Sequence, residues 1–75
     1  MNGQKPESLV ECHSEFTYAE RPTRLFWQGE WLSVENIQKQ WRIPGGKKFQ
    51  VVTEDQRAFE LFYGELYDEW RIHEL

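Results

Sequence analysis

Short segments that alternate apolar and polar residues, separated by turn-forming residues, make up most of this sequence after residue 20. Residues 48–53 and 58–63 place large apolar side chains at every second position, the spacing of a β-strand with one buried face. Residues 25–28 and 69–75 are also strand-like, because they are short and rich in large apolar side chains. Turn signals separate these segments at Pro44-Gly45-Gly46, at residues 54–57 and at residues 64–68. The pattern predicts an all-β fold.

The number and spacing of these segments predict about five short antiparallel strands in a meander that curls into a small open barrel. Curling suits a chain of 75 residues, because a flat sheet would leave one face wet and its edges unpaired. We expect residues 1–20 to be a flexible or weakly ordered segment, in which residues 16–18 are a candidate edge strand. Residues 21–75 then form one small domain, with Leu66 and Tyr67 tucked inside its last turn.

A β-hairpin is predicted around Gly29, because glycine suits the first central position of a two-residue type II′ turn. With Gly29 and Glu30 in the turn, opposed residues of the two strands share a face of the sheet. One face is then apolar and carries Leu25, Trp27, Leu32 and Val34. The other face carries Phe26, Gln28, Trp31 and Ser33. The agreement between the two strands supports the hairpin.

The apolar alternation changes phase after Val34, because the next large apolar residues stand at odd-numbered positions. A continuous strand would need a β-bulge near Glu35-Asn36. The alternative is a short helix over residues 34–42, capped by Ser33, which would make the fold α+β. We favour the bent strand, because aromatic strand-like segments lie on both sides of this region.

Composition excludes several classes of protein. The chain holds four Trp, three Tyr and five Phe, and disordered chains are poor in such residues. No apolar run approaches the roughly 20 residues needed to span a bilayer, so no membrane association is expected. A single cysteine, Cys12, excludes a disulfide scaffold and suits a reducing, cytoplasmic location.

No residue pattern points to catalysis, a cofactor or a metal. Cys12 and His13 are adjacent, but neighbouring side chains of an extended segment point to opposite faces and cannot form a catalytic pair. His13 and His73 are far apart in the sequence, and no spacing typical of metal ligands is present. The lysines and glycines of residues 44–48 lack the pattern of a phosphate-binding loop. We therefore expect no enzyme activity and no catalytic, cofactor-binding or metal-binding residues.

Aromatic and basic residues together form the best candidate for a binding surface. The candidate residues are Phe26, Trp31, Trp41, Arg42, Lys47 and Lys48. Rings on both faces of one hairpin are more than a single core needs, unless barrel closure and the N-terminal segment bury them. Exposed rings beside cations recognise other proteins or stack the bases of single-stranded nucleic acid. The net charge of −4 disfavours nucleic acid, so we expect a protein partner and keep a nucleic-acid-binding small barrel as the alternative.

A series of aromatic and turn residues carries a resemblance over residues 22–75. The series is Trp27-x-Gly29-x-x-x-x-Val34-x-x-Ile37-x-x-x-Trp41-Arg42, then Phe49-x-Val51, Phe59-Glu60-Leu61-x-Tyr63 and Trp70-x-Ile72. It resembles a family of small bacterial domains of unknown function, found alone and as C-terminal appendages of ImuB-type, Y-family DNA-polymerase-like proteins. The resemblance implies a β-rich module of a bacterial cytoplasm with an association with DNA repair, and it brings no catalytic residues. We therefore expect a non-catalytic binding or accessory module.

Overall fold

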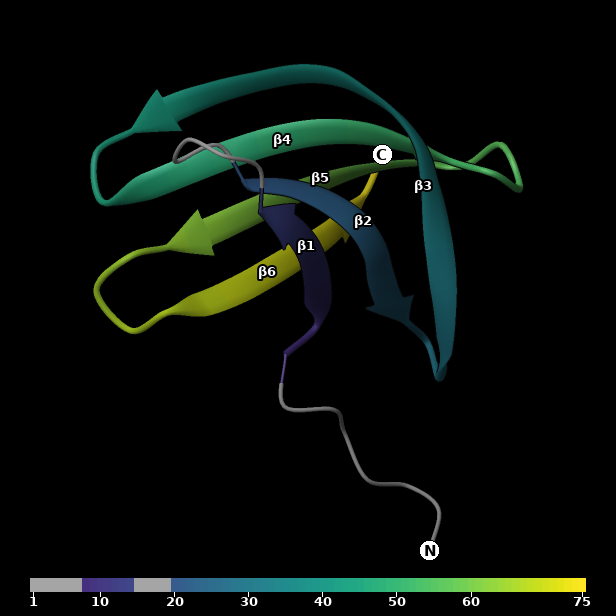
Figure 1. Cartoon of the computed structure of the whole chain (residues 1–75), viewed down its shortest axis with the longest axis horizontal. Coiled ribbons are helices and arrows are strands. Elements are labelled where there is room, and N and C mark those ends of the chain that lie inside the picture. Colours follow the sequence, from purple (N-terminus) through teal and green to yellow (C-terminus); the bar gives the residue numbers. More distant parts are fainter. Residues whose placement is uncertain (1–7, 15–19) are drawn as a thin grey trace, which may run out of the picture.

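The computed structural model describes residues 8–14 and 20–75. Each strand pairs with the next one along the chain, so the sheet is an antiparallel meander (Figure 1). The strands are β1 (Val10–Ser14), β2 (Glu20–Trp27), β3 (Glu30–Ile43), β4 (Gly46–Thr53), β5 (Ala58–Gly64) and β6 (Glu69–Glu74). Within these residues there is no helix, and the sheet curls into a half-barrel. The predicted all-β meander is therefore confirmed, with six strands where about five were expected.

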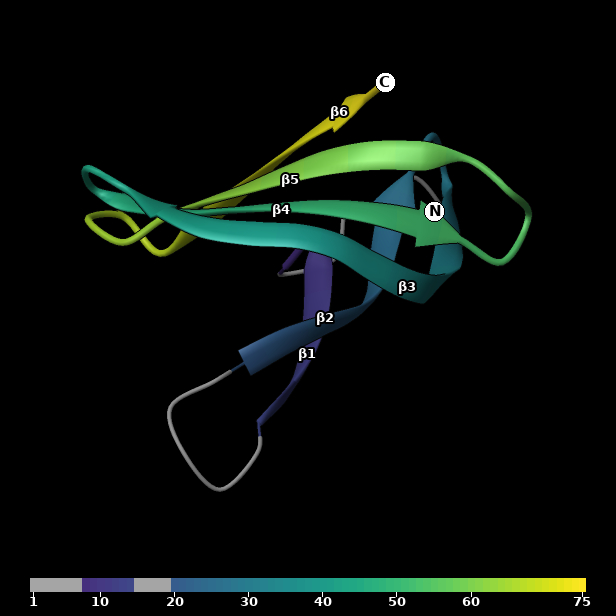
Figure 2. The same ribbon diagram turned by 90° about the horizontal axis from the view of Figure 1, so that it is seen from above.

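Strand β3 is long enough to belong to both halves of the sheet. Its first part pairs with β2 and its second part pairs with β4. The β3–β4 register shifts between Val34 and Asn36 and again between Ile37 and Lys39. Such bulges bend a strand and increase its twist. The bent strand is therefore confirmed, and the alternative helix over residues 34–42 is wrong. Because of the bend, β1 and β2 lie on one side of the sheet formed by β3–β6 (Figure 2).

The core fills the space between these two halves of the sheet. Its buried side chains are Val10, Leu25, Leu32, Phe49, Val51, Phe59 and Leu61. Trp27 packs against this core, with its ring 5.3 Å from the ring of Phe59 in an edge-on arrangement. Every second residue of β4 and β5 points inward, as the sequence pattern predicted. The other residues of these strands form the outer face of the sheet.

The turn between β2 and β3 differs from the prediction. Trp27 pairs with Glu30, so the turn residues are Gln28 and Gly29 rather than Gly29 and Glu30. Both have positive φ, 50° and 88°, which is the mark of a type I′ turn. The predicted type II′ turn is wrong because Gln28 adopts the left-handed conformation that the prediction reserved for glycine.

The prediction of which residues share each face of this hairpin is correct, although the predicted turn is not. Leu25 pairs with Leu32 on the inner face, and Phe26 pairs with Trp31 on the outer face. The observed register differs from the predicted one by two residues, which is the side-chain period of a strand. Each side chain of the two strands therefore stays on its predicted face, whereas Gln28, which was expected on the outer face, lies in the turn.

Strand β1 is part of the folded domain. Val10 is only 3% exposed, and the backbone N–H of Phe26 donates to the carbonyl oxygen of Leu9 at 2.8 Å. The predicted flexible or weakly ordered segment, residues 1–20, thus contains a strand that completes the core. The candidate edge strand at residues 16–18 lies outside the described residues.

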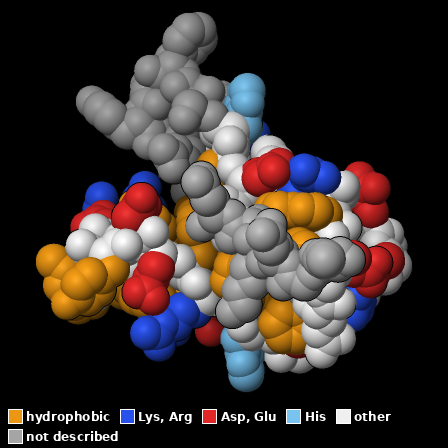
Figure 3. All heavy atoms as spheres, turned by 90° about the horizontal axis from the view of Figure 1, so that it is seen from below, with side chains coloured by type: hydrophobic (Ala, Val, Ile, Leu, Met, Phe, Trp, Pro, Cys, Tyr) orange, Lys and Arg blue, Asp and Glu red, His pale blue; other side chains and the backbone are white. Residues whose placement is uncertain are grey.

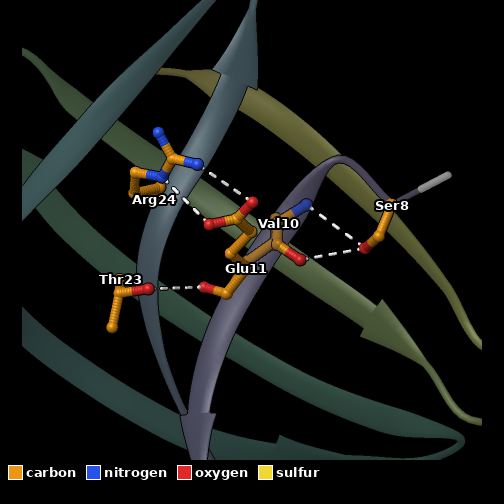
Figure 4. A network of polar contacts seen from close by, with 5 residues as sticks. All are labelled: Ser8, Val10, Glu11, Thr23 and Arg24. Carbon is orange, nitrogen blue, oxygen red and sulfur yellow. Dashed lines mark hydrogen bonds and ion pairs between the residues drawn. The ribbon is translucent and has the colours of Figure 1, made fainter. Parts of the chain in front are cut away.

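Polar contacts on the outer face tie β1 to β2 (Figure 4). The guanidinium group of Arg24 donates two hydrogen bonds to the carboxylate of Glu11, at 2.9 and 3.0 Å. The hydroxyl of Thr23 donates to the backbone carbonyl of Glu11 at 3.1 Å. A paired geometry of this kind fixes the register of the two strands.

Candidate functional site

Phe26 and Trp31 form a local cluster on the outer face of β2 and β3. Their ring centroids lie 5.2 Å apart at an interplanar angle of 62°. The guanidinium carbon of Arg24 lies 4.8 Å from the centre of the Trp31 ring, within the range of a cation–π interaction. Both rings are half-buried. These two candidate residues therefore contact each other and Arg24, and they present little free aromatic surface.

Arg24 and Glu11, the charged residues beside this cluster, are paired with each other. The hydrogen bonds from Arg24 lower the pKa of the Glu11 carboxyl group, and their attraction outweighs the opposing effect of desolvation. The same hydrogen bonds raise the pKa of Arg24. Arg24 is thus shared between Glu11 and the ring of Trp31, which suits a structural role on this face.

The other four candidate residues share one hairpin but not one face. Trp41 pairs with Lys48, and Arg42 pairs with Lys47, across β3 and β4. Lys47 has the same parity as the buried Phe49, so Arg42 and Lys47 belong to the inner side of the sheet. Trp41 and Lys48 belong to the outer face. The structure therefore divides the predicted cluster into two pairs.

Trp31 and Trp41 are not brought together either. They stand ten residues apart on β3, which corresponds to roughly 33 Å of extended strand. The two bulges lie between them and turn the strand. The candidate residues thus occupy three separate places in the molecule.

Strand register extends the Trp41–Lys48 pair into a row of four residues across the outer face. Lys48 pairs with Phe62 on β5, and Phe62 pairs with Arg71 on β6. We name this the outer row; it consists of Trp41, Lys48, Phe62 and Arg71. Aromatic and cationic side chains alternate along it, one from each of four neighbouring strands. Sequence reasoning missed Phe62 and Arg71, because only the sheet register brings them into line with Trp41 and Lys48.

The outer row is partly open to solvent. Trp41 is 38% exposed, and Arg71 is also exposed, whereas Lys48 and Phe62 are half-buried. The ammonium nitrogen of Lys39, two residues before Trp41 on the same face of β3, lies 6.0 Å from the centre of the Trp41 ring. Lys48 forms a loose ion pair with Glu60, with an N–O distance of 3.7 Å. Both partners are partly exposed, so the pair is weak and easily exchanged for another anion.

The inner side of the same hairpin carries a different set of contacts. Arg42 forms an ion pair with Glu65, with an N–O distance of 3.2 Å. The ring of Trp70 lies 5.9 Å from the ring of Phe49 and 5.0 Å from that of Tyr63. These rings extend the core toward the end of the sheet, so Trp70 serves packing.

Two turns meet at that end of the molecule, which lies at the left in Figure 1. Pro44-Gly45 joins β3 to β4, and residues 65–68 join β5 to β6. The backbone N–H of Glu65 donates to the carbonyl oxygen of Gly45 at 2.8 Å. The hydroxyl of Tyr63 donates to the carboxylate of Asp68 at 2.7 Å. The β5–β6 turn is therefore held both to its neighbouring turn and to its own strand.

This turn exposes two large apolar side chains. Leu66 is 82% exposed and Tyr67 is 77% exposed, so the prediction that both are tucked inside the turn is wrong. The turn lies at the end of the sheet, and the described part of the chain leaves both side chains largely uncovered. Figure 3 shows hydrophobic side chains gathered at this left-hand end. We name Leu66 and Tyr67 the turn patch.

A cleft of about 200 Å³ lies beside the turn patch. Its lining residues are Pro44, Gly45, Phe62, Gly64, Leu66, Tyr67, Glu69 and Arg71. A larger polar cleft, of about 330 Å³, lies at the β3 bulge and includes His13, Arg21, Glu35 and Asn36. The first cleft joins the turn patch to the outer row through Phe62 and Arg71.

Neither a metal-ligand cluster nor a facing Cys12–His13 pair is found in the part of the chain that the structure describes. No three His, Cys, Asp or Glu side chains among these residues are placed to hold a metal ion. Cys12 packs against the core, whereas its neighbour His13 is exposed, so the two side chains lie on opposite faces of β1. Among the same residues, no helix has the length and apolar character needed to cross a membrane.

Comparison with protein-family models, with curated proteins and with solved structures gives no match for this chain.

Proposed function

We propose that this protein is a small non-catalytic binding module that recognises another protein through the turn patch. The observation that carries the proposal is the exposure of Leu66 and Tyr67, at 82% and 77%, on a turn held by hydrogen bonds. Because the turn is anchored at Glu65 and Asp68, its backbone is held in place at the end of the sheet before a partner arrives. Preorganisation of this kind lowers the entropic cost of binding.

The chemistry of the turn patch suits a protein partner. Leu66 and Tyr67 together offer apolar surface that becomes favourable only when another molecule covers it. Tyrosine is among the residue types that dominate binding energy at protein interfaces. The neighbouring cleft can receive one apolar side chain of the partner, while Glu69 and Arg71 provide a charged rim. The resemblance to appendages of DNA-polymerase-like proteins favours a partner that works in DNA repair.

The test first captures binding partners of the full chain and then measures their affinity with purified proteins. The immobilised full chain retains proteins from a lysate of the source cells, and each retained protein is then purified and titrated against the wild-type chain. The Leu66→Ala/Tyr67→Ala variant is expected to bind at least about tenfold more weakly, since hot-spot truncations cost roughly 2 kcal/mol or more. Both side chains lie largely in solvent, so the variant should keep the unfolding midpoint of the wild type.

Leu75→Ala is the matched control. Leu75 is another exposed large hydrophobic residue, 60% exposed, and its backbone N–H bonds to Ala58 at the opposite end of β5 from the turn patch. This variant should bind the partner as the wild type does. Equal affinity of the wild-type chain and the double variant for the purified partner would refute the proposal, as would a lysate from which nothing is retained.

A further inference from the structure

We infer that the outer face of β3–β6 binds single-stranded nucleic acid, with the outer row as its contact surface. This inference goes beyond the proposed function, because it concerns another ligand class and centres on Trp41 and Lys48 rather than on the turn patch. It rests on the register that places rings and cations alternately on neighbouring strands.

The spacing of the row suits a strand of unpaired bases. Neighbouring strands lie about 4.8 Å apart, so Trp41 and Phe62 stand about 10 Å apart with Lys48 between them. Unpaired bases stack on aromatic side chains, and cations beside the rings attract the phosphates that connect the bases. Arg71 continues the row beyond Phe62, and Lys39 adds a third cation beside Trp41.

The charge of this face differs from that of the whole chain. The cations Lys39, Lys48 and Arg71 share the outer face of β3–β6 with the acids Glu60 and Glu69. The face is therefore slightly positive although the chain has a net charge of −4. The ion pair that Glu60 makes with Lys48 is partly exposed and long, so a phosphate can replace it. Binding should be modest in affinity and should depend strongly on salt.

The backbone in the middle of this surface favours bases over a peptide. Strands β4 and β5, which carry Lys48 and Phe62, are paired on both sides, whereas among the described residues β3 at Trp41 pairs with β4 alone and β6 pairs with β5 alone. A peptide bound in an extended form normally adds to a free sheet edge, where its backbone finds hydrogen-bond partners. The middle of the outer row offers only side chains, which a stacked base and a phosphate can use without backbone pairing.

The inference is tested by fluorescence anisotropy of a labelled oligothymidine of about 12 nucleotides, a length within the usual site sizes of small barrels. The full chain should bind it at low salt. Contacts to two or three phosphates predict that affinity falls about 7- to 18-fold between roughly 50 and 200 mM NaCl. Trp41→Ala should weaken binding by about tenfold, and Trp41→Phe should retain most of it.

Adjacent lysines provide the matched control for charge. Lys48→Ala removes a cation from the outer row and should reduce the slope of log affinity against log salt by about 0.7. Lys47→Ala removes the same charge from the inner side and should change the slope little. Circular dichroism and thermal unfolding of each variant establish that the fold is kept. The Leu66→Ala/Tyr67→Ala variant should bind the oligonucleotide normally, which separates this test from that of the proposed function.

Three results would overturn the inference. One is the absence of oligonucleotide binding at low salt, where the phosphate attraction is strongest. Another is an equal effect of Lys47→Ala and Lys48→Ala, which would indicate attraction without a defined surface. The third is a folded Trp41→Ala variant that binds the oligonucleotide as tightly as the wild type. This outcome would overturn the inference even if the variant bound a protein partner more weakly.

Discussion

Thr53 is a buried polar residue at the end of β4, with no exposed surface. Its hydroxyl donates to the carboxylate of Asp55 and accepts the backbone N–H of Arg57 at 3.2 Å. The guanidinium group of Arg57 donates to the same carboxylate at 3.1 Å. These contacts close the β4–β5 turn. They satisfy a hydroxyl that would otherwise be costly to bury.

This arrangement makes stability depend on the protonation of Asp55. The hydrogen bond from Thr53, helped by Arg57 and opposed by desolvation, lowers the pKa of Asp55. A lowered folded-state pKa contributes stability above the unfolded-state pKa, and this contribution is lost as pH falls through the folded-state value. Urea unfolding across the acid range should therefore show a smaller loss of stability with falling pH for Asp55→Asn than for the wild type.

Glu54→Gln is the control for this measurement, because the Glu54 side chain makes none of these contacts. It should follow the wild-type pH dependence. Part of the acid sensitivity should remain in Asp55→Asn, since the pKa of Glu11 is also lowered in the folded chain. Identical pH profiles for Asp55→Asn and the wild type would contradict the assignment.

At the scale of elements, Gly46 of β4 faces Gly64 of β5 and leaves no room for a side chain of its own. A Cβ atom added at Gly46 would lie 1.9 Å from the backbone oxygen of Tyr63, so the β5 backbone would have to move. Gly46→Ala should therefore cost roughly 1–3 kcal/mol in the free energy of unfolding, as overpacking usually does. Denaturant unfolding measures this cost directly.

The facing glycine supplies the comparison for that variant. A Cβ atom at Gly64 would meet nothing nearer than 3.6 Å, which is ordinary contact with the Phe62 ring. Gly64→Ala should therefore be much less destabilising than Gly46→Ala. If the two variants lost the same stability, the close approach at Tyr63 would not be the cause.

Some features of the strands and turns could be predicted from the sequence, and others could not. Alternation predicted the inner faces of β4 and β5, and the change of phase after Val34 predicted the bulge, because both follow from the two-residue period of a strand. The predicted β2–β3 turn was wrong because Gln28, which is not a residue type that favours positive φ, adopts the left-handed conformation in this hairpin.

Other features depend on the arrangement of the whole chain. Strand β1 was not predicted, since Val10 is its only fully buried apolar residue and gives no alternation to detect. Leu66 and Tyr67 were predicted to be tucked inside their turn, yet the described part of the chain leaves both largely exposed at the end of the sheet. The outer row was only half predicted, because Trp41 and Lys48 meet Phe62 and Arg71 through sheet register alone.

At the scale of the molecule, β1 decides whether the half-barrel can close its core. A domain of this size lies near the limit at which one core is sufficient, so the loss of one strand is severe. A chain that begins at residue 20 would lose Val10 from the core and would leave the N–H of Phe26 without its partner Leu9. We expect this shortened chain to lose the cooperative thermal unfolding and the near-ultraviolet circular dichroism of the full chain.

A single substitution in the full chain tests the contribution of β1 to the core without removing the strand. Val10→Ala in the full chain should cost about 2 kcal/mol, since it removes buried methyl groups and leaves a cavity. His13→Ala, at an exposed position of the same strand, should change stability by no more than about 0.5 kcal/mol. A shortened chain that unfolds cooperatively at the wild-type midpoint would show that β2–β6 close the core alone. The folded domain would then begin near residue 21, as the sequence pattern predicts, and β1 would only cover a core already formed.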